Sequence, residues 1–225
     1  MTELTEEQHA GEFIVTEANG SLSRESATVL SGQNLKAGHV LGKVAVGTAT
    51  GAAVSGNTGN GAISAVSAGA TAKAGVYTAN LIEPAANGGT FSVEDPDGVN
   101  VGTAVVGTPF AGPVNFTIAD GATDFVAGDR FRITVAEGSG KYKEYNPANT
   151  DGSQTAVALL LDAVDATGGD KDGVIVARHA EVNAAELIWF SGADANQKSA
   201  GLAQLKTHDI LARYTHHGTQ KITAA

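Results

Sequence analysis

The sequence predicts a mainly β protein of the α+β class, with a short C-terminal helix and a second small β domain inserted into the first. Two observations predict this fold. Short Val-rich apolar runs alternate with Gly-rich turn signals, and aromatic residues make up only 5% of the chain. The charged, patterned sequence also stops near residue 50 and resumes near Lys141, with Gly-, Ala-, Thr- and Val-rich sequence between. Runs of this kind are typical of short strands joined by tight turns.

The interruption divides the chain into predicted domains. Residues 1–12 form a flexible acidic arm with four Glu and no Lys or Arg. Residues 13–50 and 141–213 form one discontinuous host domain, residues 51–140 an inserted β domain, and residues 214–225 a loose tail. A chain that leaves a domain and returns to it is typical of a scaffold that carries an accessory module, so the organisation favours a structural or interaction protein.

The host domain is predicted from short apolar runs. Between Gly32 and Val44, glycines break the chain into tight turns and short strands, a pattern that suits the wall of a compact β-barrel or β-clip. Asp162–Gly173 is expected to be a polar loop. The predicted host strands are Phe13–Thr16, Thr28–Leu30, Ala156–Leu161 and Val174–Ala177.

Two capping boxes predict helix starts near the C-terminus. In each, a short polar side chain is followed three residues later by Glu or Gln: Asn183 with Glu186, and Asp194 with Gln197. The second is expected to lead a helix to about Lys206.

The insert is predicted to be a small β-sandwich or barrel, because five or six short strands follow one another with turn signals between them. Phe131, Ile133 and Val135 alternate with polar residues, as in a half-buried strand. The run Gly56–Gly61 is interpreted as a hinge into the insert. The expected strands are Ala62–Val66, Gly75–Ile82, Thr90–Val93, Val101–Val106, Val114–Ile118 and Phe131–Val135.

Composition excludes several classes of function. The net charge is −10 and the basic residues are scattered, so nucleic-acid binding is not expected. No apolar stretch approaches a membrane span and no leader peptide is visible, so no membrane partner is expected. The chain has no Cys, which rules out disulfides and thiolate metal sites.

No motif predicts a catalytic, cofactor-binding or metal-binding residue. The segment Asp95–Gly98 resembles the start of a calcium loop but lacks the later ligands, so we interpret it as a turn. No His pair has zinc spacing, and Gly56–Gly61 matches neither phosphate-binding fingerprint. Trp189, the single Trp, is either a core residue or part of a subunit interface, where aromatic residues are enriched.

The host segments resemble the lambda-type bacteriophage head decoration protein family. The segments that carry the resemblance cover about half the chain, and the insert is not part of the minimal family domain. They are Glu12–Val15, Val29–Val44, Lys141–Ala163, Val174–Trp189 and Gln197–Arg213.

The resemblance implies a non-enzymatic structural protein with no cofactor and with a β-clip type fold. Family members form homotrimers on the outside of the expanded capsid and reinforce it against the pressure of packaged DNA. The expected partners are the major capsid protein and further copies of the chain, and the expected location is the outer capsid surface of the virion after assembly in the host cytoplasm. The N-terminal arm, with Phe13, Ile14 and Val15, would bind the capsid as an added strand.

Two other functions remain open from the sequence. The insert could make the protein a virion-surface binding module that recognises a host glycan or protein, which needs an exposed aromatic side chain or polar pocket on the insert. A hydrolase would need acidic or His side chains converging in one cleft, and the sequence has no such spacing.

Overall fold

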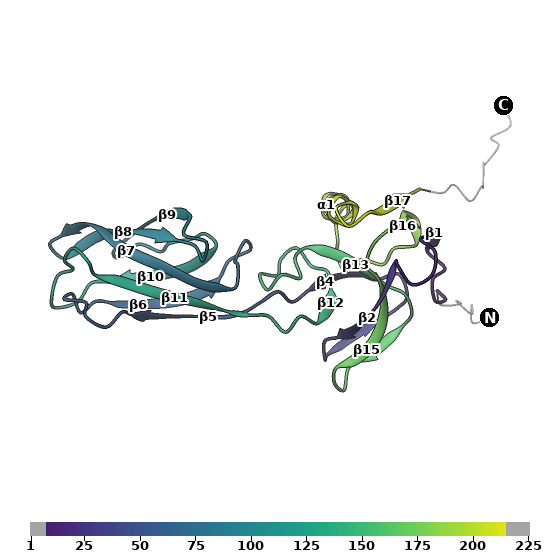
Figure 1. Cartoon of the computed structure of the whole chain (residues 1–225), viewed down its shortest axis with the longest axis horizontal. Helices are drawn as coiled ribbons and strands as arrows, with labels where there is room; N and C mark the ends of the chain where they lie inside the picture. Colours follow the sequence, from purple (N-terminus) through teal and green to yellow (C-terminus); the bar gives the residue numbers. More distant parts are fainter. Residues whose placement is uncertain (1–7, 215–225) are drawn as a thin grey trace, which may run out of the picture. The chain divides into compact units, whose positions relative to one another are not determined.

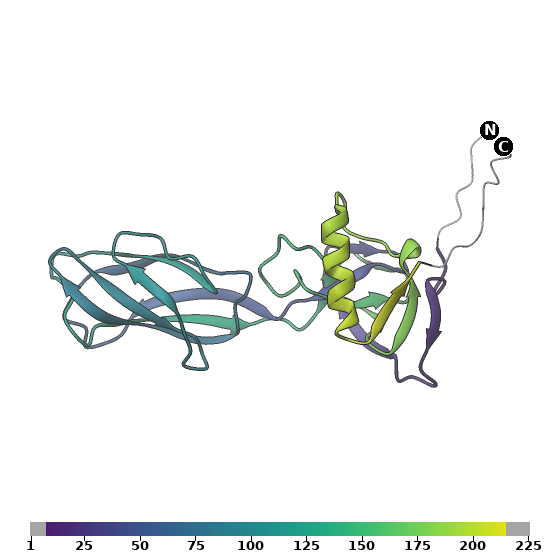
Figure 2. The same ribbon diagram turned by 90° about the horizontal axis from the view of Figure 1, so that it is seen from above.

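The computed structural model describes residues 8–214, which divide into two compact units. Unit 1 comprises the described residues up to Lys43, then Lys141–Pro147, and Thr155 onward. Unit 2 comprises Val44–Gly140 and Ala148–Gln154. The boundary expected at residue 50 falls inside strand β5 (Val46–Ala53). Figures 1 and 2 show the strands of each unit. The mainly β fold with one short C-terminal helix is confirmed, and among the described residues no helix could cross a membrane.

A closed five-stranded barrel forms the centre of unit 1, with the strand order β12-β2-β15-β13-β4. It closes where β4 pairs with β12 in antiparallel register, Lys43 lying opposite Tyr142. The barrel strands are β2 (Arg24–Val29), β4 (Val40–Lys43), β12 (Tyr142–Glu144), β13 (Ala156–Leu160) and β15 (Lys171–Val176).

Two smaller sheets and a helix complete unit 1. The strands β3 (Gln33–Leu35) and β14 (Val164–Ala166) pair with each other. A three-stranded sheet has the order β1-β16-β17, and helix α1 lies beside it. Its members are β1 (Ile14–Glu17), β16 (Ala180–Asn183), β17 (Ile210–Arg213) and, next to the sheet, α1 (Ala195–Lys206).

Strand β13 is buried on both faces, which explains its uninterrupted apolar sequence. Leu160 belongs to the core inside the barrel with Val29 and Leu41, whereas Leu159 belongs to a second core that includes Leu205 of α1. Because successive side chains of a strand point to opposite faces, a strand between two cores needs apolar residues at consecutive positions.

Local sequence explains the single helix and one element that stays shorter than expected. Asp194 accepts a hydrogen bond from the Gln197 N–H and the Gln197 side chain reaches back, so the predicted capping box is confirmed. At the other predicted helix start, Asn183 caps only the 3₁₀ turn η1 (Ala184–Glu186). Leu187 then returns to extended backbone and is buried in the core, which ends the turn.

The polar loop expected at 162–173 is only partly a loop. It contains β14 and the start of β15, because Val164 and Ala166 are buried and pair with β3. Three-residue strands are set by tertiary pairing, and their sequence carries little periodicity.

Unit 2 consists of two sheets packed around one apolar core. One sheet has five strands in the order β5-β11-β7-β8-β9, and the other pairs β10 with β6. The alternation predicted for the Phe131 strand is confirmed, since its odd-numbered residues from 131 to 135 are buried. The strands not yet bounded are β6 (Ala62–Ala68), β7 (Gly75–Ala85), β8 (Gly88–Glu94), β9 (Asn100–Val105), β10 (Val114–Ala119) and β11 (Arg130–Glu137).

The run Gly56–Gly61 lies inside unit 2 and supports a buried aromatic ring. A Cβ on Gly59 would lie 2.5 Å from Cδ1 of Phe125, and one on Gly61 would lie 2.3 Å from its Cζ. The Phe125 ring is 5.2 Å from Phe91 in an edge-to-face arrangement. The interpretation of this run as a hinge is therefore wrong: the glycines allow Phe125 to reach the core.

Candidate functional site

The first described residues are hydrogen-bonded along unit 1. The Gln8 side chain donates to the Glu186 carbonyl at 3.1 Å, and the Gly11 N–H donates to the Leu161 carbonyl at 2.9 Å. The predicted arm, residues 1–12, therefore lies outside the described residues over 1–7, and its last part follows the surface of unit 1.

The three residues predicted to bind the capsid take different positions. The Phe13 side chain is fully buried in the core beneath the three-stranded sheet, and its carbonyl accepts from the Asn183 N–H at 2.8 Å. Ile14 is half-buried against the same core, while Val15 is 43% exposed. Phe13 thus anchors the segment, and Val15 is the apolar side chain of the three that faces solvent.

Strand β1 is an edge strand that a polar contact ties to the rest of its sheet. It pairs with β16 and with no other described strand. On β16, Glu181 accepts from Thr16 of β1 at 3.4 Å and from both Nε and NH2 of Arg213 on β17, at 3.2 and 2.6 Å. The hydrogen bonds from Arg213 lower the pKa of Glu181 below its ordinary value. The unpaired side of β1 leaves N–H and C=O groups available to an added strand.

Trp189 packs on helix α1. Its ring lies 5.9 Å from Tyr145 in an edge-to-face arrangement, and it rests against Gly201 of the helix. The side chain is half-buried, so part of it faces solvent. The expectation of a subunit interface at Trp189 stays a prediction.

A pocket of about 410 Å³ in unit 1 gathers charged side chains that are already paired with one another. Arg178 forms an ion pair with Glu25, and Nδ1 of His179 lies 3.4 Å from Asp209. Charges compensated in pairs do not form an acid and a base poised for a substrate. The lining residues are Glu25, Lys43, Tyr142, Val157, Ala177, Arg178, His179, His208 and Asp209.

The buried His39 has a structural position. Its Nδ1 accepts from the Lys36 N–H at 2.9 Å, and burial lowers its pKa. Burial raises the pKa of Glu144, whose carboxylate lies 3.6 Å from Nε2 of His39. Among residues 8–214, no three His, Asp or Glu side chains are grouped to hold a metal ion.

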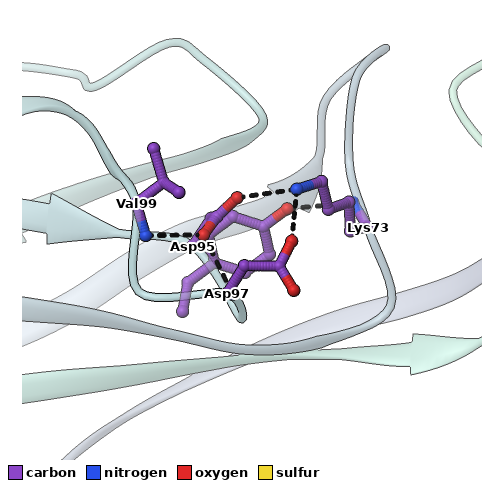
Figure 3. A network of polar contacts seen from close by, with 5 residues as sticks. Lys73, Asp95, Asp97 and Val99 are labelled. Carbon is purple, nitrogen blue, oxygen red and sulfur yellow. Dashed lines mark hydrogen bonds and ion pairs between the residues drawn. The ribbon is translucent and has the colours of Figure 1, made fainter.

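In unit 2, the sequence that resembles a calcium loop is a closed polar network (Figure 3). Nζ of Lys73 donates to Asp95 at 2.9 Å and to Asp97 at 2.5 Å. The other oxygen of Asp95 accepts from the N–H groups of Asp97 and Val99, both at 2.9 Å. The Lys73 hydrogen bond, followed by that of Val99, lowers the pKa of Asp95. The carboxylates thus hold a turn and a lysine, in agreement with the interpretation of this segment as a turn.

Unit 2 has no exposed aromatic side chain that could stack on a sugar. All six of its aromatic residues, each of them described, are buried or half-buried: Tyr77, Phe91, Phe110, Phe116, Phe125 and Phe131.

Comparison with solved structures finds two crystal forms of Xanthomonas campestris FlgL. Both are 22% identical to the chain, with TM-scores of 0.32 and 0.31. They cover 48% of this chain, which spans about a third of the FlgL chain. No curated protein matches the sequence.

Comparison with protein families finds one whose model matches almost the whole chain. The model for bacteriophage lambda head decoration protein D matches residues 3–210 and so includes the insert. Proteins of this family bind the capsid and have no enzymatic activity. The chain therefore belongs to the bacteriophage lambda head decoration protein D family and is a structural decoration protein of the virion's capsid surface.

Proposed function

We propose that the protein binds as homotrimers to the outside of the expanded capsid and stabilises it against the pressure of the packaged DNA. The observation that carries the proposal is the family match over residues 3–210. The partner is the major capsid protein. Many copies bound around a shell add their individual contacts, so a modest affinity per subunit is sufficient.

The N-terminal segment is the proposed point of attachment. Phe13 anchors the segment in the core, so residues before it can bind the shell without disturbing unit 1. The unpaired edge of β1 supports strand addition, in which main-chain hydrogen bonds give affinity and exposed side chains such as Val15 give specificity.

Binding to purified expanded shells tests the attachment point. We expect removal of residues 1–7 and the substitution Val15→Lys each to weaken binding, because the first removes the segment and the second places a charge where an apolar contact is proposed. Val174→Lys is the matched control, since Val174 is 39% exposed on a strand of the same unit and lies outside the segment. Equal shell binding by the truncated, Val15 and Val174 variants would refute the attachment point.

Stabilisation is a separate measurement. Full particles saturated with the protein should retain their DNA to a higher temperature than particles without it. Expanded shells should bind the protein and unexpanded shells should not. Release of DNA at the same temperature with and without bound protein would refute the stabilising role.

A further inference from the structure

A groove of about 280 Å³ runs between helix α1 and strand β17 in unit 1. Its walls are largely apolar, with one cationic side chain from each element. The lining residues are Leu202, Ala203, Lys206, Leu211, Ala212 and Arg213.

The groove lies beside an open strand edge. Strand β17 pairs in parallel with β16, and no other described strand pairs with it. Leu211 and Ala212 are half-buried, although they belong to the last described strand of the chain. An edge with unpaired backbone groups next to apolar side chains is a surface that another chain can cover.

The groove carries positive charge on a protein whose net charge is −10. Helix α1 contains Lys198 and Lys206 but no Asp or Glu. Arg213 is paired with Glu181, whereas the exposed Lys206 has no ion pair with any described residue. A symmetric contact of this groove with the same groove of another copy would bring two Lys206 side chains together, which is unfavourable.

Residues 162–172 of the same unit form a complementary surface, which we call the acidic segment. It contains Asp162, Asp165, Asp170 and Asp172, all exposed, against the single cation Lys171. Asp170 is paired with Lys141. The other three accept hydrogen bonds from neutral donors only: Asp162 from Ala163 N–H, Asp165 from Thr167, and Asp172 from the Thr28 hydroxyl.

We propose that the subunits of the trimer contact one another head to tail, with the acidic segment of one copy placed at the α1–β17 groove of the next. This inference rests on the trimer of the proposed function. The groove and the acidic segment belong to different elements, so a contact between them leaves one of each free in a pair of copies. Such a heterologous contact closes into a ring when the last copy meets the first. The apolar groove supplies the buried area and the charges set the orientation.

Charge reversal on each side, alone and together, tests the contact. The variants are Lys206→Glu for the groove, Asp162→Lys with Asp172→Lys for the acidic segment, and all three combined. Lys198→Glu is the matched control, because Lys198 carries the same charge on the same helix but does not line the groove. Oligomeric mass is measured against protein concentration by analytical ultracentrifugation at low and high salt, with circular dichroism to check folding.

Each single-sided reversal should raise the concentration at which the trimer dissociates by at least about tenfold, because like charges then face each other. The combined variant should recover most of the loss, and Lys198→Glu should change little. A wild-type trimer whose dissociation is the same in all variants would overturn the head-to-tail contact and leave the proposed function intact. A wild-type protein that is monomeric even on the shell would instead overturn the trimer itself. Loss of shell binding by Lys206→Glu with an unchanged trimer would assign the groove to the capsid and overturn the inference.

Discussion

A Cβ atom on Gly201 would lie 2.5 Å from Cζ3 of Trp189, closer than side chains pack. The indole ring occupies the space that a side chain at this position of α1 would need, and Tyr145 closes the site from another direction at 3.3 Å. Glycine is unfavourable inside a helix by about 1 kcal/mol relative to Ala, so its presence here reflects this packing.

Gly201→Ala should therefore destabilise the protein in spite of its better helix propensity. We expect a loss of about 1–3 kcal/mol in the free energy of unfolding, as for other overpacked cores. Urea denaturation followed by Trp189 fluorescence measures it. A second substitution, Trp189→Phe, removes part of the obstructing ring, so Gly201→Ala should cost less in that background. A stabilising Gly201→Ala would show that the ring yields and that propensity decides.

The carboxylate of Asp129 should be a main stabilising element of unit 2. It is 3% exposed and accepts from the N–H groups of Thr58, Gly59 and Val126, at 2.7, 2.8 and 3.0 Å. Asn at this position replaces an acceptor with a donor, so Asp129→Asn should cost about 2 kcal/mol of unfolding free energy, as expected for buried donors left without a partner. Asp124→Asn is the control, because Asp124 is exposed and accepts one hydrogen bond, from the Asn87 N–H.

The same carboxylate gives a pH dependence of known sign. Burial alone raises its pKa, but the three N–H donors outweigh burial, and the pKa lies below the ordinary value. A depressed folded pKa contributes stability that is complete above the unfolded value, about 3.9, and is lost as the pH falls through the folded value. The difference in stability between wild type and Asp129→Asn should therefore shrink as the pH falls below about 4. A constant difference down to the lowest accessible pH would contradict this assignment.

In the network of Figure 3, the two aspartates should contribute unequally. The Asp95 side chain is 6% exposed and accepts two backbone N–H bonds as well as Lys73, whereas that of Asp97 is 65% exposed and accepts only Lys73. Asp95→Ala should lower the melting temperature of unit 2 clearly, and Asp97→Ala only slightly, because a solvent-exposed ion pair contributes little. Calorimetry at low and high salt checks this; an equal effect of the two substitutions would contradict it.

Unit 2 should be removable without loss of the barrel. Lys43 and Tyr142 are paired neighbours on adjacent antiparallel strands, so the chain can be rejoined there by an Asn-Gly turn in place of residues 44–141. We expect the shortened chain to keep a cooperative unfolding transition and to bind expanded shells. Loss of shell binding by a shortened chain that still folds would show that unit 2 takes part in gripping the capsid.

Local chemistry in the sequence determined much of this protein. Alternation in the Phe131 strand, the turn at Asp95–Gly98, the capping box at Asp194 and the interruption of the host pattern are all visible without a structure, because each depends on residues a few positions apart. The family resemblance also depends on sequence alone.

The tertiary structure decided what depends on distant residues. Strand β14 exists because β3 pairs with it, and the Gly56–Gly61 run is a seat for Phe125, because a ring some sixty residues away in the sequence fills the space. Phe13 became a buried anchor and not an exposed contact, because the second core lies over the barrel at that point. The α1–β17 groove and its charge depend on two elements meeting in space, so no local pattern in the sequence could indicate them.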